Sequence, residues 1–222
     1  MTRSPLFVCF SGIDGSGKTT YSQELLQYLE EQGLPTKYVW LNSKPILLAP
    51  IRKLIHKTIL CTVDMKEDYE SYHRQRKRYA FKHRFARNVY YGTMLFDYLL
   101  WVYWNLLPHY FRGVSIVCDR YIYDLVINLG DILDYSAERE VQLIRRLLVL
   151  LPKPTNVLIC DVDEHIAFQR KYDTPHLSYL LAHRPRYRYI AEVLQLPVLD
   201  SSDSIESVME QVLQIIDSQA TG

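Results

Sequence analysis

A glycine-rich segment near the N-terminus carries the residue types that hold phosphate. It reads Gly12-Ile-Asp-Gly-Ser-Gly-Lys18-Thr19 and satisfies the P-loop pattern G-x-x-x-x-G-K-[ST]. The glycines let several backbone N–H groups converge on one anion. Lys18 can reach the β- and γ-phosphates of a nucleotide, and the Thr19 hydroxyl can ligate Mg²⁺. The segment therefore predicts a site for nucleotide phosphates.

A second reactive cluster follows the apolar run SIVC. It is Asp119-Arg120-Tyr121. An acid at such a strand end can hold Mg²⁺ directly or through water, and an adjacent arginine can bridge two phosphates during transfer. In the alternative interpretation, Asp119 caps the next helix and Arg120 forms a surface ion pair. The accompanying P-loop favours the phosphate role.

A third acidic pair, Asp161 and Asp163, follows the apolar run VLIC. Because Asp163 precedes the helical pattern EHIAF, we expect it to cap that helix. Asp161 is a rival candidate for the metal. We prefer Asp119 for that role because Arg120 stands beside it.

Basic and aromatic residues alternate between positions 71 and 96, where the sequence holds no acidic residue. At helical spacing, Arg84 and Arg87 can share one side of a helix with Arg76. Three interpretations stay open: a solvated helix face, an acceptor-phosphate site with aromatic stacking on a base, and a nucleic-acid patch.

The elements that must position these clusters alternate along the chain. Short apolar runs, typical of buried strands, are followed by longer patterns of helical period. The expected strands are Leu6–Ser11, Lys37–Leu41, Val114–Asp119, Asn156–Asp161 and Pro197–Asp200. The expected helices are Lys18–Glu31, a region after Pro50, Tyr121–Leu129, Ser136–Leu151, Glu164–Lys171 and Ser204–Ser218. Such alternation predicts an α/β fold with a parallel sheet covered by helices on both faces. In that fold the clusters meet at the carboxyl ends of the strands.

Residues 93–107 form a run that is apolar on nearly every face. It is shorter than the roughly 20 residues that span a bilayer, and it contains Asp97, so we expect no transmembrane segment. A helix with one face in the core and the other in a homodimer interface explains the pattern better. Peripheral membrane contact through Trp101 and Trp104 is the alternative.

Composition narrows the class of protein. The 222 residues predict a single domain, and a formal net charge of +1 gives no global field that would attract DNA or RNA. Three of the four cysteines (Cys9, Cys118 and Cys160) lie inside apolar runs, which is typical of core thiols rather than disulfides. With no signal-peptide pattern at the N-terminus, we expect a cytoplasmic protein.

A P-loop alone does not fix the reaction, because switches, motors, transporters and kinases share it. The nearest sequence to the guanine-reading motif N-K-x-D of GTPases is Asn42-Ser-Lys-Pro45, which lacks the aspartate. No transporter signature of the LSGGQ type occurs. These gaps favour a small-molecule kinase.

Four segments together resemble the thymidylate kinase family of nucleoside-monophosphate kinases. They are FSGIDGSGKTT, the Asp119–Tyr121 triplet DRY, VLICDVDEHIAFQRK and LDSSDSIESV, which occur in the family's order. The resemblance implies a three-layer P-loop NTPase fold with a five-stranded parallel sheet. It also implies ATP with Mg²⁺ as donor, a small-molecule nucleotide as acceptor, and a homodimer built from helices in the region of residues 93–107.

The resemblance assigns roles to single residues. It implies that Asp14 reaches the acceptor sugar, that Arg120 spans the donor and acceptor phosphates, and that Asp119 lies near the metal with Thr19. A lid of about residues 171–186 would follow Arg170, and Arg184 and Tyr187 match the helix after it. Because Gly15 stands where some members carry a catalytic arginine, Arg184, Arg186 or Arg188 would replace that arginine. The expected ATP-binding residues are Gly12, Asp14, Gly15, Ser16, Gly17, Lys18, Thr19, Thr20 and Arg170.

The chain departs from the family in an acceptor-site region of about residues 43–113. The family's Arg-Glu-Pro-Gly-Gly-Thr segment is replaced by WLNSKPILLAPIRK, and Asp97 stands without a neighbouring arginine. The expected substrate-binding residues are Asp14, Asn42, Arg84, Arg87, Asp97, Arg120 and Tyr121. We therefore expect a kinase of thymidine monophosphate or a related nucleotide. A P-loop ATPase, a nucleotide-binding regulator and a nucleoside kinase with a hydroxyl acceptor stay open as alternatives.

Overall fold

A computed structural model describes residues 5–41, 84–170 and 176–220. The strands are β1 (Phe7–Gly12), β2 (Thr36–Trp40), β3 (Ser115–Asp119), β4 (Asn156–Asp161) and β5 (Val198–Asp200). The helices are α1 (Lys18–Glu31), α4 (Arg84–Phe111), α5 (Ile122–Leu133), α6 (Ala137–Leu150), α7 (Glu164–Arg170), α8 (Leu177–Leu194) and α9 (Ile205–Ala220).

The strands form one parallel sheet in the order β2-β3-β1-β4-β5. The central strand β1 pairs with β3 on one side and with β4 on the other. Its register aligns Phe10 with Asp119 and Gly12 with Cys160, so the ends of three strands meet beside the glycine-rich turn. The predicted five-stranded parallel sheet and its three layers are confirmed.

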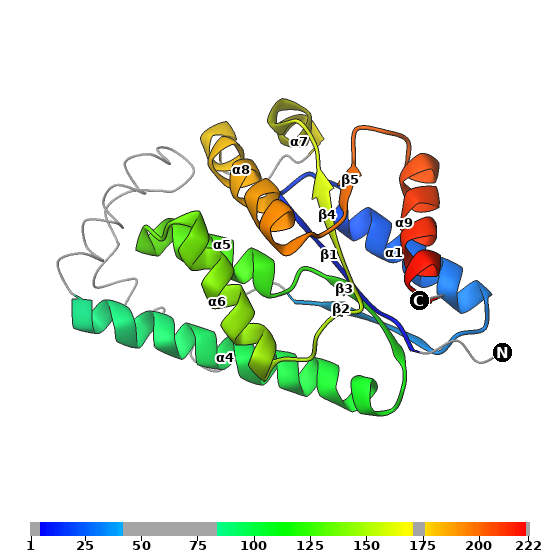
Figure 1. Ribbon diagram of the computed structural model, residues 1–222, viewed down its shortest axis with the longest axis horizontal. Coiled ribbons are helices and arrows are strands. Elements are labelled where there is room, and N and C mark those ends of the chain that lie inside the picture. The colour runs from blue at the N-terminus through cyan, green and yellow to red at the C-terminus, as the bar shows by residue number, and fades with distance from the viewer. Residues whose placement is uncertain (1–4, 42–83, 171–175, 221–222) are drawn as a thin grey trace.

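Helices cover both faces of the sheet (Figure 1). On one face, Val8, Phe10 and Leu158 pack against α1 and α9. On the other face, Cys9, Cys118 and Ile159 pack against α4, α5 and α8. Because successive strand residues point to opposite faces, each buried strand supplies both cores with apolar side chains. The free thiols of Cys9, Cys118 and Cys160 are buried in these cores, as their apolar surroundings predict.

The limits of α1, α6, α7 and α9 agree with the predicted ranges within two residues, whereas α5 ends four residues later than predicted. The helix predicted after Pro50 lies outside the described residues as far as position 83. Residues 177–186, predicted as part of a lid, form the first half of α8. The apolar segment 93–107 lies inside α4, which is 28 residues long. In the described part of the chain, no helix is long and apolar enough to cross a membrane.

Candidate active site

The P-loop joins β1 to α1 and leaves the start of α1 open toward the site. Gly17 takes a left-handed φ of 83° at the N-cap of α1 and has no side chain to cap the helix. The first N–H groups of a helix have no acceptor within the helix, and its dipole places positive charge there. The start of α1 can therefore receive a phosphate.

Gly15 marks the place where the P-loop passes closest to α7. Its φ is 83°, and a Cβ at this position would overlap the backbone carbonyl of Ala167. The backbone of α7 thus leaves room for glycine only. A P-loop arginine at position 15 does not fit this packing, so any further cation must come from another segment.

The Lys18 side chain folds back over the P-loop. Its Nζ donates to the carbonyl of Gly12 at 2.9 Å and to that of Ile13 at 2.6 Å, and the residue is 4% exposed. Burial lowers the pKa of Lys18, and the charge of Arg120 lowers it further. An anionic phosphate is the ligand that best compensates a buried ammonium group with a positive neighbour.

Thr19 and Asp119 meet as the metal prediction requires. Thr19 Oγ1 donates to Asp119 Oδ2 at 2.6 Å, and Tyr38 on β2 donates to the same oxygen at 3.1 Å. Asp119 Oδ1 is buried and accepts no hydrogen bond from the described residues. Hydroxyl and carboxylate oxygens are the ligands that Mg²⁺ prefers, so this pair fits a magnesium ion.

Arg120 follows β3 in a strained backbone conformation. Its φ of 70° lies in the left-handed region, which costs a non-glycine residue about 1–2 kcal/mol. The guanidinium lies between two carboxylates: NH2 donates to Asp14, and NH1 donates to Asp124 at 3.2 Å. Burial opposes its charge, but the carboxylates of Asp124 and Asp14 outweigh burial and raise the pKa of Arg120. Arg120 therefore stays protonated, and its two carboxylate partners fix the orientation of the guanidinium.

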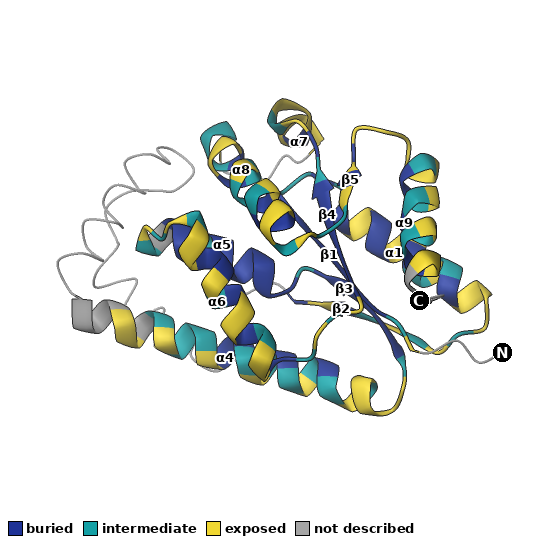
Figure 2. Ribbon diagram, in the orientation of Figure 1, coloured by how far each residue is buried: buried dark blue, intermediate teal, exposed yellow. Residues whose placement is uncertain are grey.

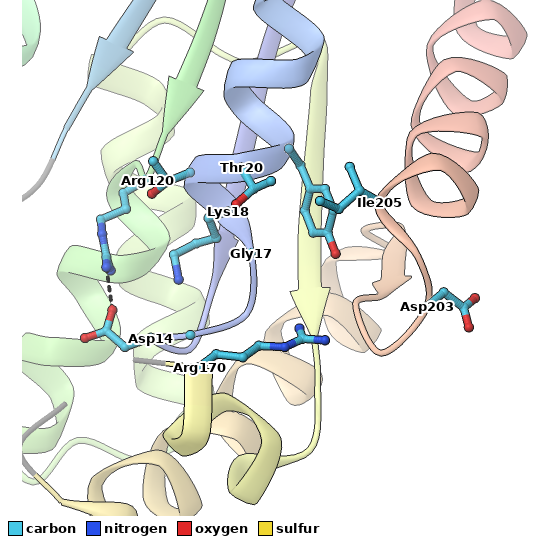
Figure 3. Close-up of a pocket in the computed structure, with 11 residues that line it drawn as sticks. Asp14, Gly17, Lys18, Thr20, Arg120, Arg170, Asp203 and Ile205 are labelled. Carbon is cyan, nitrogen blue, oxygen red and sulfur yellow. Dashed lines mark hydrogen bonds and ion pairs between the residues drawn. The ribbon is translucent and has the colours of Figure 1, made fainter. Parts of the chain in front are cut away.

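These groups surround a cavity of about 420 Å³ (Figure 3). Asp14 and Arg120 face each other on one side, and Arg170 and Asp203 lie on the other. Arg170 reaches the site from α7 and donates to the carbonyl of Ser201 at 2.8 Å. The lining residues are Asp14, Gly15, Gly17, Lys18, Thr19, Thr20, Tyr21, Arg120, Arg170, Asp203 and Ile205. Such a volume accommodates a small-molecule ligand.

Most predicted ATP-binding residues therefore lie together. Gly12, the last residue of β1, and Ser16, in the loop, are buried and are not among the lining residues. Ser16 is buried, and Lys18 Nζ lies 3.5 Å from its hydroxyl. We infer that both residues shape the loop.

Tyr121 departs from its predicted role in substrate binding. Its ring is fully buried in the core against Phe7, and its hydroxyl donates to the carbonyl of Pro152 at 2.8 Å. The left-handed turn at Arg120 directs the next side chain into the core. The sequence cluster Asp119-Arg120-Tyr121 thus supplies two site residues and one core residue.

Two of the three arginines expected to replace a P-loop arginine, Arg184 and Arg186, are held by carboxylates outside the cavity. Arg184 forms two hydrogen bonds with Asp161, at 2.7 and 3.0 Å, and one with Glu164 at 2.8 Å. Arg186 pairs with Glu140 at 2.6 Å. Neither lines the cavity. A catalytic role for either stays a prediction, and it requires the arginine to leave these partners.

Other predicted acceptor residues lie apart from this site or outside the described residues. Asp97 is buried on α4 and does not line the cavity. Arg84 and Arg87 belong to the first turn of α4, but their side chains lie outside the described part. Asn42 and residues 71–83 of the basic stretch also lie outside it.

The two other predicted acids, Asp161 and Asp163, lie at the end of β4 and directly before α7. Asp163 accepts the backbone N–H of His165 at 2.9 Å at the start of α7, which confirms its capping role. Asp161 forms an ion pair with Arg184.

Sequence reasoning missed Tyr38, Asp124 and Asp203. For Asp124, its third position in a helix that follows a strand was the available signal.

Comparisons with known proteins agree with this geometry. A family model described as thymidylate kinase matches residues 10–212. The thymidylate kinase of Ligilactobacillus salivarius is 23% identical over 226 residues, which cover 96% of this chain and 97% of that protein. The thymidylate kinase of Caldicellulosiruptor saccharolyticus is 24% identical over 233 residues, covering 95% of each chain. The thymidylate kinase of Caenorhabditis elegans is 27% identical over 173 residues, covering 74% of this chain and 66% of that protein.

Proposed function

The chain belongs to the thymidylate kinase family of ATP-dependent nucleoside-monophosphate kinases, and we propose that thymidine monophosphate or a related nucleotide is its acceptor. One observation carries the proposal. Lys18, Thr19 with Asp119, and Arg120 converge on one cavity at the start of α1. This is the set of charges that phosphoryl transfer from ATP uses.

The reaction needs little covalent chemistry from the protein. An oxygen of the acceptor phosphate attacks the γ-phosphorus in line, the bond from that phosphorus to the β,γ-bridging oxygen breaks, and ADP leaves. Because the acceptor oxygen is already anionic, no side chain has to remove a proton. The residues act by positioning the groups and by stabilising the charge that spreads over the transferred phosphoryl.

Each cation has a defined place in this scheme. The P-loop amides and Lys18 hold the donor phosphates, and Arg120 reaches between donor and acceptor phosphates. Arg170 lies on the donor side with Asp203. Asp14, which lines the cavity and accepts a hydrogen bond from Arg120, is suited to accept one from a hydroxyl group of the acceptor sugar.

We propose Mg²⁺ as the metal, held by the oxygens of Thr19 and Asp119. The buried Asp119 Oδ1, which has no donor among the described residues, supports this assignment. When bound, Mg²⁺ neutralises charge on the donor phosphates. The catalytic use of Arg184 or Arg186 and the acceptor role of residues 43–113 are proposals carried by the family resemblance.

We also propose that the enzyme is a cytoplasmic homodimer. The buried free thiols of Cys9, Cys118 and Cys160 support a reducing compartment. The outer face of α4 supports self-association, because Phe96, Trp104 and other large apolar side chains are exposed on it (Figure 2).

The test is ADP formation from ATP with and without added acceptors. We expect thymidine monophosphate to accelerate turnover, and removal of Mg²⁺ with a chelator to abolish it. A panel of the other nucleoside monophosphates establishes which base is accepted. ADP release that no nucleoside monophosphate accelerates would exclude the kinase and favour an ATPase or regulator. Acceleration by thymidine alone would indicate a hydroxyl acceptor.

A further inference from the structure

Asp124 is a buried carboxylate that the scheme above leaves without a role. It lies in the first turn of α5 and is 3% exposed. Its Oδ1 accepts from Arg120 NH1 at 3.2 Å and from the Tyr187 hydroxyl at 2.8 Å. Its Oδ2 accepts from the Ser11 hydroxyl at 2.6 Å and from the Tyr121 N–H at 3.4 Å. One carboxylate thus joins β1, the end of β3, α5 and α8.

Helix capping alone does not explain this residue. The capping contact, to the Tyr121 N–H, is the longest of the four. A neutral serine or asparagine satisfies such an N–H without bringing a charge into the core. Burying a carboxylate is unfavourable unless it is paired and hydrogen-bonded. The group that requires a negative charge here is Arg120.

The two carboxylates on Arg120 lie on different sides of it. Asp14 belongs to the P-loop and lines the cavity, so an arriving phosphate or sugar hydroxyl can compete for that contact. Asp124 does not line the cavity and is held by Ser11 and Tyr187. The contact to Asp124 can therefore persist while Arg120 exchanges Asp14 for a phosphate.

We infer that Asp124 is a positioning residue for phosphoryl transfer, which anchors the Arg120 guanidinium from the side away from the cavity. The inference rests on the proposed function, because it assigns Arg120 to the transferring phosphates. Without the anchor, the left-handed backbone at Arg120 and its flexible side chain leave the guanidinium several orientations. A misplacement of about 1 Å can lower a rate about 100-fold.

Tyr187 extends this anchor to α8. Its ring is buried, and burial raises the pKa of its hydroxyl, which therefore stays protonated and donates to Asp124. The neighbouring residues Arg184 and Arg186 fix the same helix to Asp161 and Glu140. Tyr187 thus links Arg120 to α8, whose first half was predicted as part of the lid.

The first experiment replaces Asp124 and measures steady-state kinetics with ATP and the accepted monophosphate. We expect Asp124→Asn to lower kcat about 10- to 100-fold while the KM for ATP changes less than about threefold, because the P-loop is untouched. Tyr187→Phe should lower kcat less, by about three- to tenfold. Asp131→Asn is the matched control, since Asp131 is also a buried acid of α5 and does not line the cavity. A kcat for Asp124→Asn within twofold of wild type would overturn the inference.

A double-mutant cycle separates positioning from a purely structural role. If Asp124 acts through Arg120, then Asp124→Asn should have almost no further effect on kcat in an Arg120→Ala background. A structural role predicts that the two losses multiply. Full multiplication, with kcat of the double variant reduced by the product of the single losses, would refute the positioning role.

A second variant keeps the test valid if Asp124→Asn folds poorly, and a second measurement keeps it valid if the protein shows no turnover. Asp124→Ser keeps a hydroxyl that can cap α5 but removes the charge, and we expect it to fold and to lose kcat as the asparagine variant does. Independently of turnover, NMR can follow water exchange of the Arg120 guanidinium protons, identified by their loss in Arg120→Ala. Exchange should be faster in Asp124→Ser than in wild type and unchanged in Asp131→Asn. Equal exchange rates in Asp124→Ser and wild type would refute the positioning role of Asp124, even if the protein shows no kinase activity. Faster exchange without any turnover would count against the proposed function alone.

Discussion

The contacts of Lys18 in the structure differ from those that its role in phosphoryl transfer requires. In the structure its amine donates to two P-loop carbonyls, whereas in the reaction it must face the donor phosphates. Preorganised cations are worth most where water is excluded. We therefore predict that Lys18→Ala lowers kcat at least 100-fold, measured as ADP formation at saturating ATP and acceptor.

The control for this variant is Lys37→Ala, which removes an exposed lysine of β2 and should leave turnover unchanged. Thermal unfolding of both variants shows whether loss of the two P-loop contacts has disturbed the fold. Turnover of a folded Lys18→Ala protein within about fivefold of wild type would remove Lys18 from the catalytic set.

The functional groups that belong to local motifs could be predicted from the sequence. Thr19 and Asp119 are 100 positions apart, but Asp119 ends β3 and Thr19 lies at the start of α1, after the loop that follows β1. The strand ends of a parallel sheet meet at one edge. Tyr121 was predicted wrongly because a left-handed turn at its neighbour has no sequence signature when that neighbour is arginine. Asp124 was missed because its partners Ser11 and Tyr187 come from distant elements.

The helix α8 is fixed by hydrogen bonds from its arginines to carboxyl groups of neighbouring elements. Arg186 pairs with Glu140 of α6, whose carboxylate lies against Gly130 of α5, where a Cβ would overlap it. Glu140 Oε2 is buried and has no hydrogen-bond partner among the described residues. Burial raises the pKa of Glu140 from 4.5 to about 7; Arg186 opposes this effect, and Asp131 adds to it.

This raised pKa predicts a pH dependence of stability. Between pH 4.5 and 7 the unfolded chain releases the Glu140 proton and the folded protein keeps it, so rising pH favours the unfolded state. Relative to Glu140→Gln, the free energy of unfolding of the wild type should fall by about 3 kcal/mol across this range and stay level above it. Urea unfolding of both proteins from pH 4.5 to 8 measures the difference, in which other titrating groups cancel. A constant difference would mean that Glu140 stays ionised.

Elements themselves were more predictable than the contacts between them. The range of β4 was predicted to the residue, and the limits of the other strands differ by at most one residue, because buried strands have a clear apolar pattern. The lid prediction extended ten residues into α8, since its limits came from the family resemblance and not from a helical pattern in this segment. The partners of Arg184 and Arg186, Asp161 and Glu140, lie 23 and 46 positions away, a pairing that no local pattern indicates.

At the scale of the whole molecule, α4 presents two different faces. Tyr98, Val102 and Leu106 are buried against the sheet and the other helices. The opposite face carries exposed apolar side chains spaced seven, four, four and seven residues apart, which places them on one side of a helix. They are Val89, Phe96, Leu100, Trp104 and Phe111. Such a contiguous apolar face is typical of an interaction surface.

The three aromatic side chains of this face can supply a large share of an interface between two chains. Phe96, Trp104 and Phe111 are 59%, 81% and 78% exposed. At 150–250 Å² for each aromatic side chain, these exposed fractions can bury roughly 330–550 Å² per protomer, about half of the ~800 Å² that each partner contributes to a stable interface. A dimer about a twofold axis would place the face of one α4 on the same face of its partner.

We therefore predict that the wild-type protein sediments at twice the mass of the chain and that Trp104→Glu sediments as a monomer at micromolar concentration. A buried glutamate opposite its symmetry mate would place two like charges in an apolar contact. Val193→Glu, which changes an exposed apolar residue of α8 in the same way, should leave the dimer intact. A monomeric wild type, or a Trp104→Glu protein that stays dimeric, would show that the α4 face does not join two chains. Because Trp104 does not line the nucleotide cavity, a monomer that still binds ADP would separate assembly from the site.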